Sequence, residues 1–208
     1  MKVNYSKICS ELLEDLPKRT KEVIWRRFGL GGGEKETLQE VGDSYGLTRE
    51  RVRQIQDEAV SKVKPRTKQY ESIVETFIDH LRFSGNFKKE DLLLSFLGGD
   101  KFQNHVSFLL TLNDPFSRFS ENEKFHSFWT IEPKSFNFVQ KIINSFSNLL
   151  NKRKQPLSLE SLSFHQVWGK DLEKKPINTL SLEALHSFLE ISKLIQKNPY
   201  GEFGLAGW

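Results

Sequence analysis

The stretch TLQEVGDSYGLTRERVRQIQDEAVSKVK, residues 37–64, decides the fold of the first part of the chain. It opens with Thr37, followed three residues later by Glu40, a capping box in which each side chain satisfies a backbone N–H group at a helix start. Gly46 supplies the permissive backbone that a tight turn needs, and Thr48 is a suitable N-cap for a second helix. The pattern predicts two helices joined by a turn, which is a helix-turn-helix.

The second predicted helix, residues 49–64, has two different sides. At about 100° per residue its apolar residues fall on one stripe that packs inward, and these are Val52, Ile55, Ala59 and Val63. Its polar residues share an outward arc of roughly 140°, and these are Arg49, Glu50, Arg53, Gln54 and Asp57. Most of this arc lies in the first two turns, the part of a recognition helix that enters the major groove of DNA. Arginine, glutamine and glutamate bond to base edges there, so the helix is predicted to read DNA.

The positive charge of the chain is concentrated at the same end. The 208 residues carry 31 Lys+Arg and 27 Asp+Glu, a net charge of +4. Residues 1–68 hold 15 basic and 11 acidic residues, whereas residues 69–208 hold 16 of each. Residues 49–68 alone hold seven basic and three acidic residues. Such a concentration attracts phosphate through counterion release, although on charge alone a solvated helix face is the more ordinary interpretation.

Composition excludes several other classes of protein. Hydrophobic residues make up 37% and charged residues 28% of the chain, which is typical of a soluble globular protein. No apolar run approaches the roughly 20 residues of a membrane helix, so we expect a cytoplasmic protein without membrane contact. Cys9 is the single cysteine, and the five histidines are scattered, so we expect no disulfide, metal or cofactor. His126 lies near Glu121 and Glu123, but a polar hairpin turn explains this better than catalysis, and we expect no enzyme.

The predicted helix-turn-helix resembles region 4 of the sigma-70 family of RNA polymerase factors. The run TRERVRQI, residues 48–55, is the most recognisable part. Residues 16–30, which end in RFGL, resemble the first helix pair of that region. The similarity covers about residues 10–66, close to a third of the chain.

The resemblance implies roles for individual residues. The positions that read the upstream promoter hexamer are Arg49, Glu50, Arg53 and Gln54. The positions assigned to DNA phosphates are Arg27, Thr48, Arg51, Lys62 and Lys64. For Arg27, an ion pair within the helical domain is an equal alternative, and Lys62 and Lys64 are alternatively solubilising. The resemblance also implies a contact with the flap of the RNA polymerase core.

The core-binding and promoter-melting regions of the family have no counterpart in this chain, so we do not expect a complete sigma factor. The leading hypothesis is sequence-specific binding of double-stranded DNA by a transcription factor or regulator that acts at promoters. The alternative is an RNA polymerase-binding accessory module that does not read bases. The sequence leaves open the target site, the sign of regulation and the oligomeric state.

The remainder of the chain differs in composition, since 16 of its 17 phenylalanines follow residue 70. Pro65 cannot continue a helix, so residues 65–68 are predicted to be a linker. Apolar spacing then predicts three helices and a strand pair, which is the winged-helix order; the segments are 70–83, 88–97, 101–112, 116–119 and 125–131. The order recurs in 133–151, 157–164, 181–192 and a hairpin of 193–197 with 202–208 around a turn at 198–201.

The expected fold class is therefore mainly α. It comprises a sigma region 4-like domain, 1–66, and two winged-helix-like domains with small β-hairpins, 69–132 and 133–208. The ending NPYGEFGLAGW resembles a segment of bacterial proteins that join sigma region 4 to winged-helix modules, one of them similar to the RNA polymerase delta subunit. The sequence stops directly after Trp208 without a polar tail, so we expect it to be a fragment of a longer protein. Because this half has no net charge, we favour protein contact or spacing over DNA reading, and the cluster 152–154 is interpreted as a solvated helix end.

Overall fold

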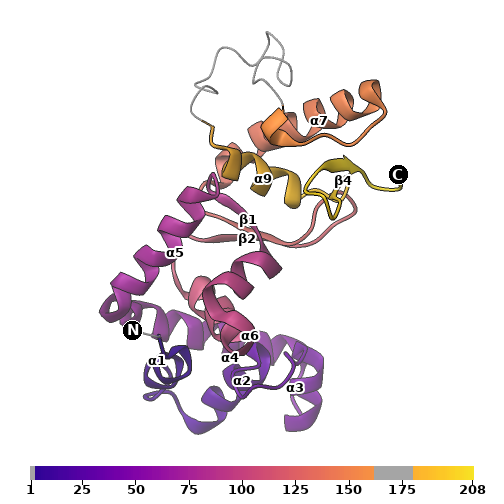
Figure 1. The fold of residues 1–208 in the computed structure, drawn as a ribbon. Helices are drawn as coiled ribbons and strands as arrows, with labels where there is room; N and C mark the ends of the chain where they lie inside the picture. Colours follow the sequence, from indigo (N-terminus) through magenta and orange to yellow (C-terminus); the bar gives the residue numbers. More distant parts are fainter. Residues whose placement is uncertain (1–2, 162–179) are drawn as a thin grey trace. The chain divides into compact units, whose positions relative to one another are not determined.

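The computed structural model describes residues 3–161 and 180–208, which form a mainly α-helical protein with two small antiparallel β-sheets (Figure 1). The predicted fold class, mainly α, is confirmed. Among the described residues, no helix combines the length and apolar character needed to cross a membrane.

The backbone groups into two compact units. Unit 1 consists of Met1–Thr76 and Leu94–Asp114, and unit 2 consists of Phe77–Leu93 and Pro115–Trp208. The predicted domains 1–66, 69–132 and 133–208 are segments expected to fold alone. The grouping of the backbone does not test that property, so the three-domain division stays a prediction.

Unit 1 begins with four helices, and glycines end two of them. They are α1 (Tyr5–Leu12), α2 (Lys18–Phe28), α3 (Leu38–Tyr45) and α4 (Arg49–Val63). Pro17 precedes α2, where the proline ring disturbs no helical hydrogen bond. Gly29 and Gly46 end α2 and α3 in the left-handed conformation, each with φ of 62°.

The inward stripe of α4 forms the core that holds the helix-turn-helix together. Val52, Ala59 and Val63 are buried, and Ile55 is partly buried. Val52 joins a cluster with Val23 of α2 and Val41 of α3, each of which is fully buried. The side of α4 that packs inward is therefore the predicted one, and this fixes which residues point outward.

The segment after α4 is helical and is bonded to the start of unit 1. Lys64–Tyr70 is a 3-10 helix, which α5 (Glu71–Phe83) follows directly. Pro65 ends α4 as predicted, but a proline fits the first turn of a following helix, so the predicted linker is a helical turn. Arg66 forms an ion pair of 2.7 Å with Asp15 and donates to the carbonyl oxygen of Glu11 at 2.9 Å.

A later segment completes unit 1. Helix α6 (Glu90–Leu112) covers the predicted helix 101–112 and residues 90–97 of the predicted helix 88–97, whose first two residues are strand instead. It is interrupted at Gly99, whose φ of 55° and ψ of −159° are not helical. Its second half lies against the end of α2. Phe28 and Phe108 form an edge-to-face pair with ring centroids 4.8 Å apart. Asn104 donates to the carbonyl oxygen of Gly29 at 3.2 Å.

Unit 2 contains a three-stranded sheet of β1 (Phe87–Lys89), β2 (Ser117–Phe119) and β3 (Phe128–Thr130). The strand order is β1-β3-β2, and both pairings are antiparallel. The predicted pairing of segments 116–119 and 125–131 is confirmed. Strand β1 was not expected, because three residues are too few to show the alternation that predicts a strand. With β1, the chain follows the order helix, strand, two helix segments, strand, strand.

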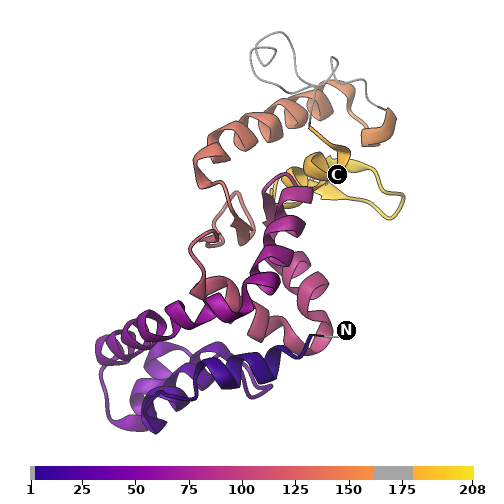
Figure 2. The same cartoon turned by 90° about the vertical axis from the view of Figure 1, so that its left-hand side faces the viewer.

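The rest of unit 2 repeats much of this order. A 3-10 helix (Pro133–Ser135) leads into α7 (Phe136–Arg153), a 3-10 helix (Leu159–Ser161) follows, and then come α9 (Leu182–Glu190), β4 (Ile195–Lys197) and β5 (Phe203–Leu205). The predicted hairpin is confirmed, and α7 runs beside it (Figure 2). Of the predicted helix 157–164, residues 159–161 form a 3-10 turn, and 162–164 lie outside the described residues.

Many of the phenylalanines that follow residue 70 lie in one core of unit 2. Phe87 and Phe128 come from the three-stranded sheet, whereas Phe146, Phe188 and Phe203 come from α7, α9 and β5. Each of these five side chains is at most 2% exposed. Both predicted winged-helix-like segments therefore contribute to the same apolar core.

Candidate nucleic-acid interface

The start of α4 is fixed by a turn that leaves little room. The Oγ1 atom of Thr48 accepts a hydrogen bond of 3.1 Å from the backbone N–H of Arg51, so the predicted N-cap is present. Gly42 of α3 faces this turn, and a Cβ atom there would lie 2.6 Å from the carbonyl oxygen of Leu47. Close packing of α3 on the turn holds α4 in one orientation relative to the two preceding helices.

The outward arc of α4 is exposed as the helical wheel predicts. The side chains of Arg49, Glu50, Arg53, Gln54 and Asp57 are all solvent-exposed. They lie on the side of α4 that is opposite the buried stripe. The structure therefore brings together the four candidate base-reading residues on one accessible surface, which we call the α4 arc.

The centre of the α4 arc is an ion-pair cluster. The guanidinium of Arg53 donates to Glu50 from Nε at 2.9 Å and from Nη2 at 2.7 Å, and Nη1 donates to Asp57 at 2.6 Å. The hydrogen bonds from Arg53 lower the pKa of Glu50, and Glu50 in turn raises the pKa of Arg53. Because these groups are exposed to water, such pairs within one helix are weak. These ion pairs orient the guanidinium of Arg53, and because they are weak, a stronger partner can replace them.

The two flanking arginines differ in their contacts. Arg51 donates from Nη1 to the side-chain oxygen of Gln54 at 3.1 Å, so the amide of Gln54 is oriented by its neighbour. Arg49 makes no ion pair with any residue that the structure describes. The arc therefore presents one arginine that is held by two carboxylates and one, at the start of the helix, that is not.

The candidate phosphate ligands fall into two groups. Thr48, Arg51 and Lys62 are exposed on or next to α4. Lys64 is partly buried and forms an ion pair with Asp114. Arg27 is also partly buried; its Nε donates to Gln56 at 3.0 Å, and burial lowers the pKa of its guanidinium. The assignment of all five residues to phosphates stays a prediction.

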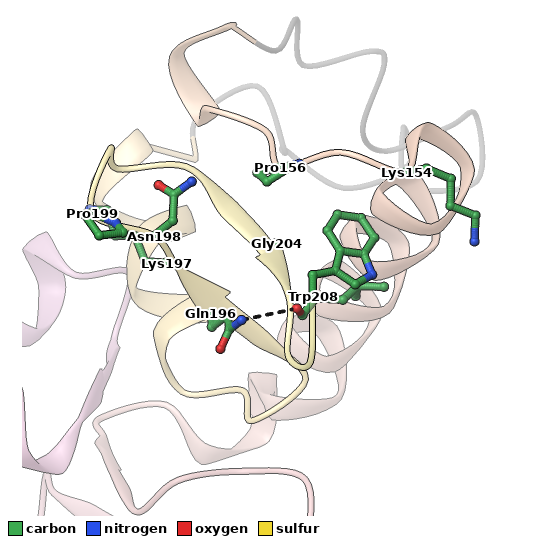
Figure 3. A pocket seen from close by; sticks show the side chains of 9 residues that line it. Lys154, Pro156, Gln196, Lys197, Asn198, Pro199, Gly204 and Trp208 are labelled. Atoms are coloured by element: carbon green, nitrogen blue, oxygen red, sulfur yellow. Dashed lines mark hydrogen bonds between the residues drawn. The ribbon is translucent and has the colours of Figure 1, made fainter.

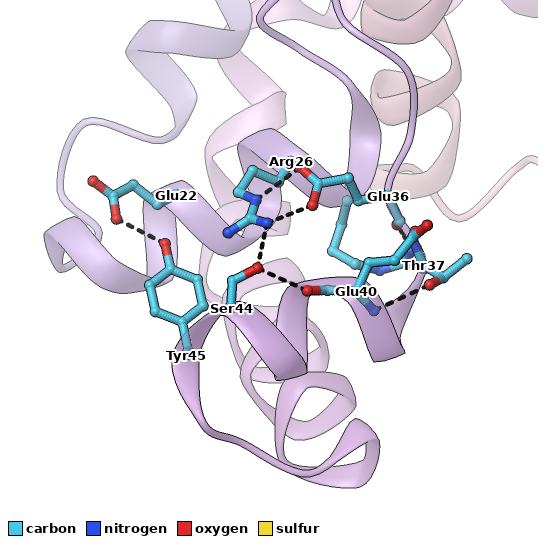
Figure 4. A network of polar contacts seen from close by, with 8 residues as sticks. Glu22, Arg26, Glu36, Thr37, Glu40, Ser44 and Tyr45 are labelled. Carbon is cyan, nitrogen blue, oxygen red and sulfur yellow. Dashed lines mark hydrogen bonds and ion pairs between the residues drawn. The ribbon is translucent and has the colours of Figure 1, made fainter.

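A polar network between α2 and α3 was missed by the sequence reasoning (Figure 4). Arg26 donates from Nε to Glu36 at 2.8 Å and from Nη2 to Ser44 at 2.7 Å. Tyr45 donates to Glu22 at 2.9 Å, and the guanidinium of Arg26 lies 5.5 Å from the centre of the Tyr45 ring. The spacing of these residues follows no helical rule, because the loop after α2 brings Glu36 back to α2. The network supports the orientation of α3 and hence of the turn.

The part of the chain that contains α2, α3 and α4 is similar to a known protein family. Residues 12–64 match the family model described as sigma-70, region 4. The predicted resemblance over about residues 10–66 is confirmed, and the matched segment contains α2, α3 and α4 complete. Residues 65–208 lie outside this match.

Similar curated proteins match the same part of the chain. RNA polymerase sigma factor sigB of Arabidopsis thaliana is 48% identical over 54 residues, which is 26% of this chain and 9% of that protein. RNA polymerase sigma factor SigA of Listeria monocytogenes is 42% identical over 67 residues, which is 31% of this chain and 18% of that protein. SigA of Listeria innocua gives the same values. The chain thus spans less than a fifth of the length of these relatives.

Proposed function

We propose that this protein binds double-stranded promoter DNA by placing the first two turns of α4 in the major groove. The single observation that carries the proposal is the α4 arc, an exposed set of base-reading residue types on a helix fixed by a helix-turn-helix. Sigma-70 region 4 is a DNA-binding and RNA polymerase-binding helix-turn-helix module, and the match over residues 12–64 supports the proposal.

In the proposed complex, Arg49, Glu50, Arg53 and Gln54 read base edges. Arg53 exchanges its exposed carboxylate partners for guanine O6 and N7, a bidentate bond that the planar guanidinium fits. The phosphate contacts of Arg27, Thr48, Arg51, Lys62 and Lys64 fix the register of the helix on the duplex and carry no sequence information. Because the match covers a small part of each relative, the proposed role is that of a transcription factor or regulator at promoters, not of a complete sigma factor.

Selection of bound sequences from a random pool of duplexes tests this function. The expected result is enrichment of a sigma-type hexamer, and binding that weakens steeply as salt rises. Substitution Arg53→Ala is expected to weaken binding of the enriched duplex between about fivefold and 150-fold and to relax the preference at one base position. The matched control is Arg82→Ala, which removes another exposed arginine paired with an acidic residue three positions earlier. Equal binding to unrelated duplexes would contradict base reading.

The second candidate function is that of an RNA polymerase-binding accessory module without base reading. The observation that favours it is the ion-pair cluster, since Glu50 and Asp57 already satisfy the guanidinium of Arg53. Retention of the RNA polymerase core by the immobilised protein, with no binding of any enriched duplex, would support this second function. Retention together with base-specific duplex binding would support both contacts in one module.

A further inference from the structure

A pocket of about 720 Å³ opens beside the β4–β5 hairpin of unit 2, far along the sequence from the helix-turn-helix (Figure 3). Its lining comes from the end of α7, the segment after it and both strands of the hairpin. The lining residues include Lys154, Pro156, Lys197, Gly204 and Trp208. We call this cavity the hairpin pocket.

Trp208 gives the hairpin pocket an accessible aromatic ring. A Cβ atom on Gly204 would lie 3.4 Å from the indole and 3.8 Å from Pro156, so the ring is seated over Gly204 with Pro156 beside it. The backbone N–H of Trp208 donates to the carbonyl oxygen of Leu205 at 3.2 Å, which ties the residue to the hairpin. The side chain is nevertheless 50% exposed. An indole that is seated on one side and open to solvent is a suitable surface for stacking.

The charged residues that line the pocket are both basic, and the ammonium of one of them, Lys197, lies 5.6 Å from the centre of the Phe203 ring. Lys154 and Lys197 line the pocket, and among the residues that the structure describes no acidic side chain lines it. Lys154 follows Lys152 and Arg153 at the end of α7, and all three residues are exposed. Glu202 of the same hairpin accepts a hydrogen bond of 2.9 Å from the side chain of Asn198. The surroundings of Trp208 therefore suit a ligand that combines an aromatic ring with negative charge.

We propose that the hairpin pocket binds single-stranded nucleic acid, with one base stacked on Trp208 and the neighbouring phosphates near Lys154 and Lys197. Exposed aromatic rings beside basic groups are the combination that single-strand-binding proteins use, because every base has a face that can stack. A duplex fits this chemistry poorly, since its bases are paired and stacked on one another and would have to be unstacked first. The side-chain amide of Gln196 also lines the pocket, and its oxygen is a suitable acceptor for a base edge.

This site differs in chemistry from the proposed duplex contact of α4. The α4 arc carries arginine, glutamine and carboxylates for base edges in a groove, whereas the hairpin pocket carries an aromatic ring and lysines. The net charge of residues 69–208 is zero, so nonspecific attraction by this half is weak, and binding depends on the local group of lysines. The two proposals are independent, because each rests on its own residues and each is tested by its own substitution.

The test measures binding of the full chain to a fluorescently labelled single-stranded oligonucleotide of mixed sequence, and in parallel to the duplex of the same sequence. Trp208→Ala is expected to weaken single-strand binding between about fivefold and 150-fold and to leave duplex binding unchanged. Trp208→Phe is expected to restore most of the affinity, because phenylalanine also stacks. Tyr200→Ala is the matched control, since Tyr200 is an 88% exposed aromatic residue of the same hairpin that does not line the pocket.

The salt dependence tests the lysines separately. Each lysine that neutralises a phosphate of a single strand contributes about 0.7 to the slope of log affinity against log salt. In the double variant Lys154→Gln and Lys197→Gln, this slope is therefore expected to fall by about 1.4. The control is Lys141→Gln, an exposed lysine on α7 that does not line the pocket.

Three outcomes overturn the proposal. One is single-strand binding that Trp208→Ala and the double lysine variant leave unchanged. Another is a reduction in affinity as large in Tyr200→Ala as in Trp208→Ala. The third is equal competition by a poly-glutamate peptide, which would show that the pocket recognises an acidic peptide instead of bases. The variant Arg53→Ala separates this test from the duplex proposal, because it is expected to weaken duplex binding and to leave single-strand binding intact.

Discussion

Phe108 links the second half of α6 to the helix-turn-helix, and its truncation tests whether this contact stabilises α2 and α4. The side chain is fully buried, and its ring forms an edge-to-face pair with Phe28 at the end of α2. Truncation of a buried phenylalanine to alanine costs about 3–5 kcal/mol, because the ring no longer packs against its neighbours and a cavity remains. We expect Phe108→Ala to destabilise unit 1 by this amount.

Hydrogen exchange of the backbone amides is the assay of choice, because it follows α2 and α4 separately from unit 2. A destabilisation of about 3–5 kcal/mol accelerates exchange from the unfolded state by about two to four orders of magnitude. We expect this acceleration in α2 and α4, accompanied by weaker duplex binding. The control is Phe83→Ala, which removes the same atoms from a side chain that is 63% exposed and is expected to change little.

A change in exchange of α2 and α4 by less than about tenfold in Phe108→Ala, equivalent to about 1.4 kcal/mol, would refute a stabilising role of Phe108. That result would mean that residues 12–64 hold their fold without the later segment. Acceleration confined to unit 2 would refute it equally, because Phe108 belongs to unit 1.

Three further predictions concern unit 1. Gly42→Ala should distort the turn and weaken duplex binding more than its cost in urea unfolding explains, because the new Cβ would lie 2.6 Å from the carbonyl oxygen of Leu47. Asp57→Asn should strengthen duplex binding measured by titration, because it removes a carboxylate that holds Arg53 at 2.6 Å and repels phosphate. His105 is 5% exposed, and burial lowers the pKa of its imidazole. Its contribution to the free energy of unfolding should therefore be complete above about pH 6.5, which is the pKa of histidine in the unfolded chain. This contribution should disappear as the pH falls toward the lower pKa of the folded protein.

Each of these predictions has a matched control. Gly46→Ala introduces a residue with a φ of 62° but with no atom within 4 Å of the new Cβ, so it should cost stability without a specific effect on binding. Glu58→Gln removes a carboxylate from the same exposed helix that is not paired with Arg53, and it should strengthen binding less than Asp57→Asn does. The variant His105→Gln should show a weaker dependence of stability on mildly acidic pH, because burial also lowers the pKa of His80 and of His126. An unchanged dependence would show that His105 does not contribute.

Local signals in the sequence were sufficient for the helix-turn-helix. A capping box, a glycine at the turn and a threonine N-cap act within a short stretch of chain, and the structure contains all three. The inward stripe of α4 followed from the period of the helix alone. The outward arc, and with it the candidate base-reading set, is the complement of that stripe and was predictable for the same reason.

Contacts between distant segments could not be predicted in this way. The pairing of Arg53 with Glu50 and Asp57 follows helical spacing, but the bond from Arg26 to Glu36 depends on the path of a loop. Strand β1 is too short to carry a pattern, and it is defined by its partner β3. The assignment of the second half of α6 to unit 1 depends on packing against α2, which no periodicity within 101–112 indicates.

The division of unit 1 into two stretches of chain has a consequence for the order of events during synthesis. The ribosome produces Lys64, the end of the sigma-like match, 50 residues before it produces Asp114, the end of unit 1. At about 5–20 residues per second, this interval lasts about 2.5–10 s. During it, the nascent helix-turn-helix lacks the helix that covers Phe28. The α4 arc is therefore expected to reach its final orientation late, after much of the following helical segment has left the ribosome, and a chaperone that binds apolar surface has time to act first.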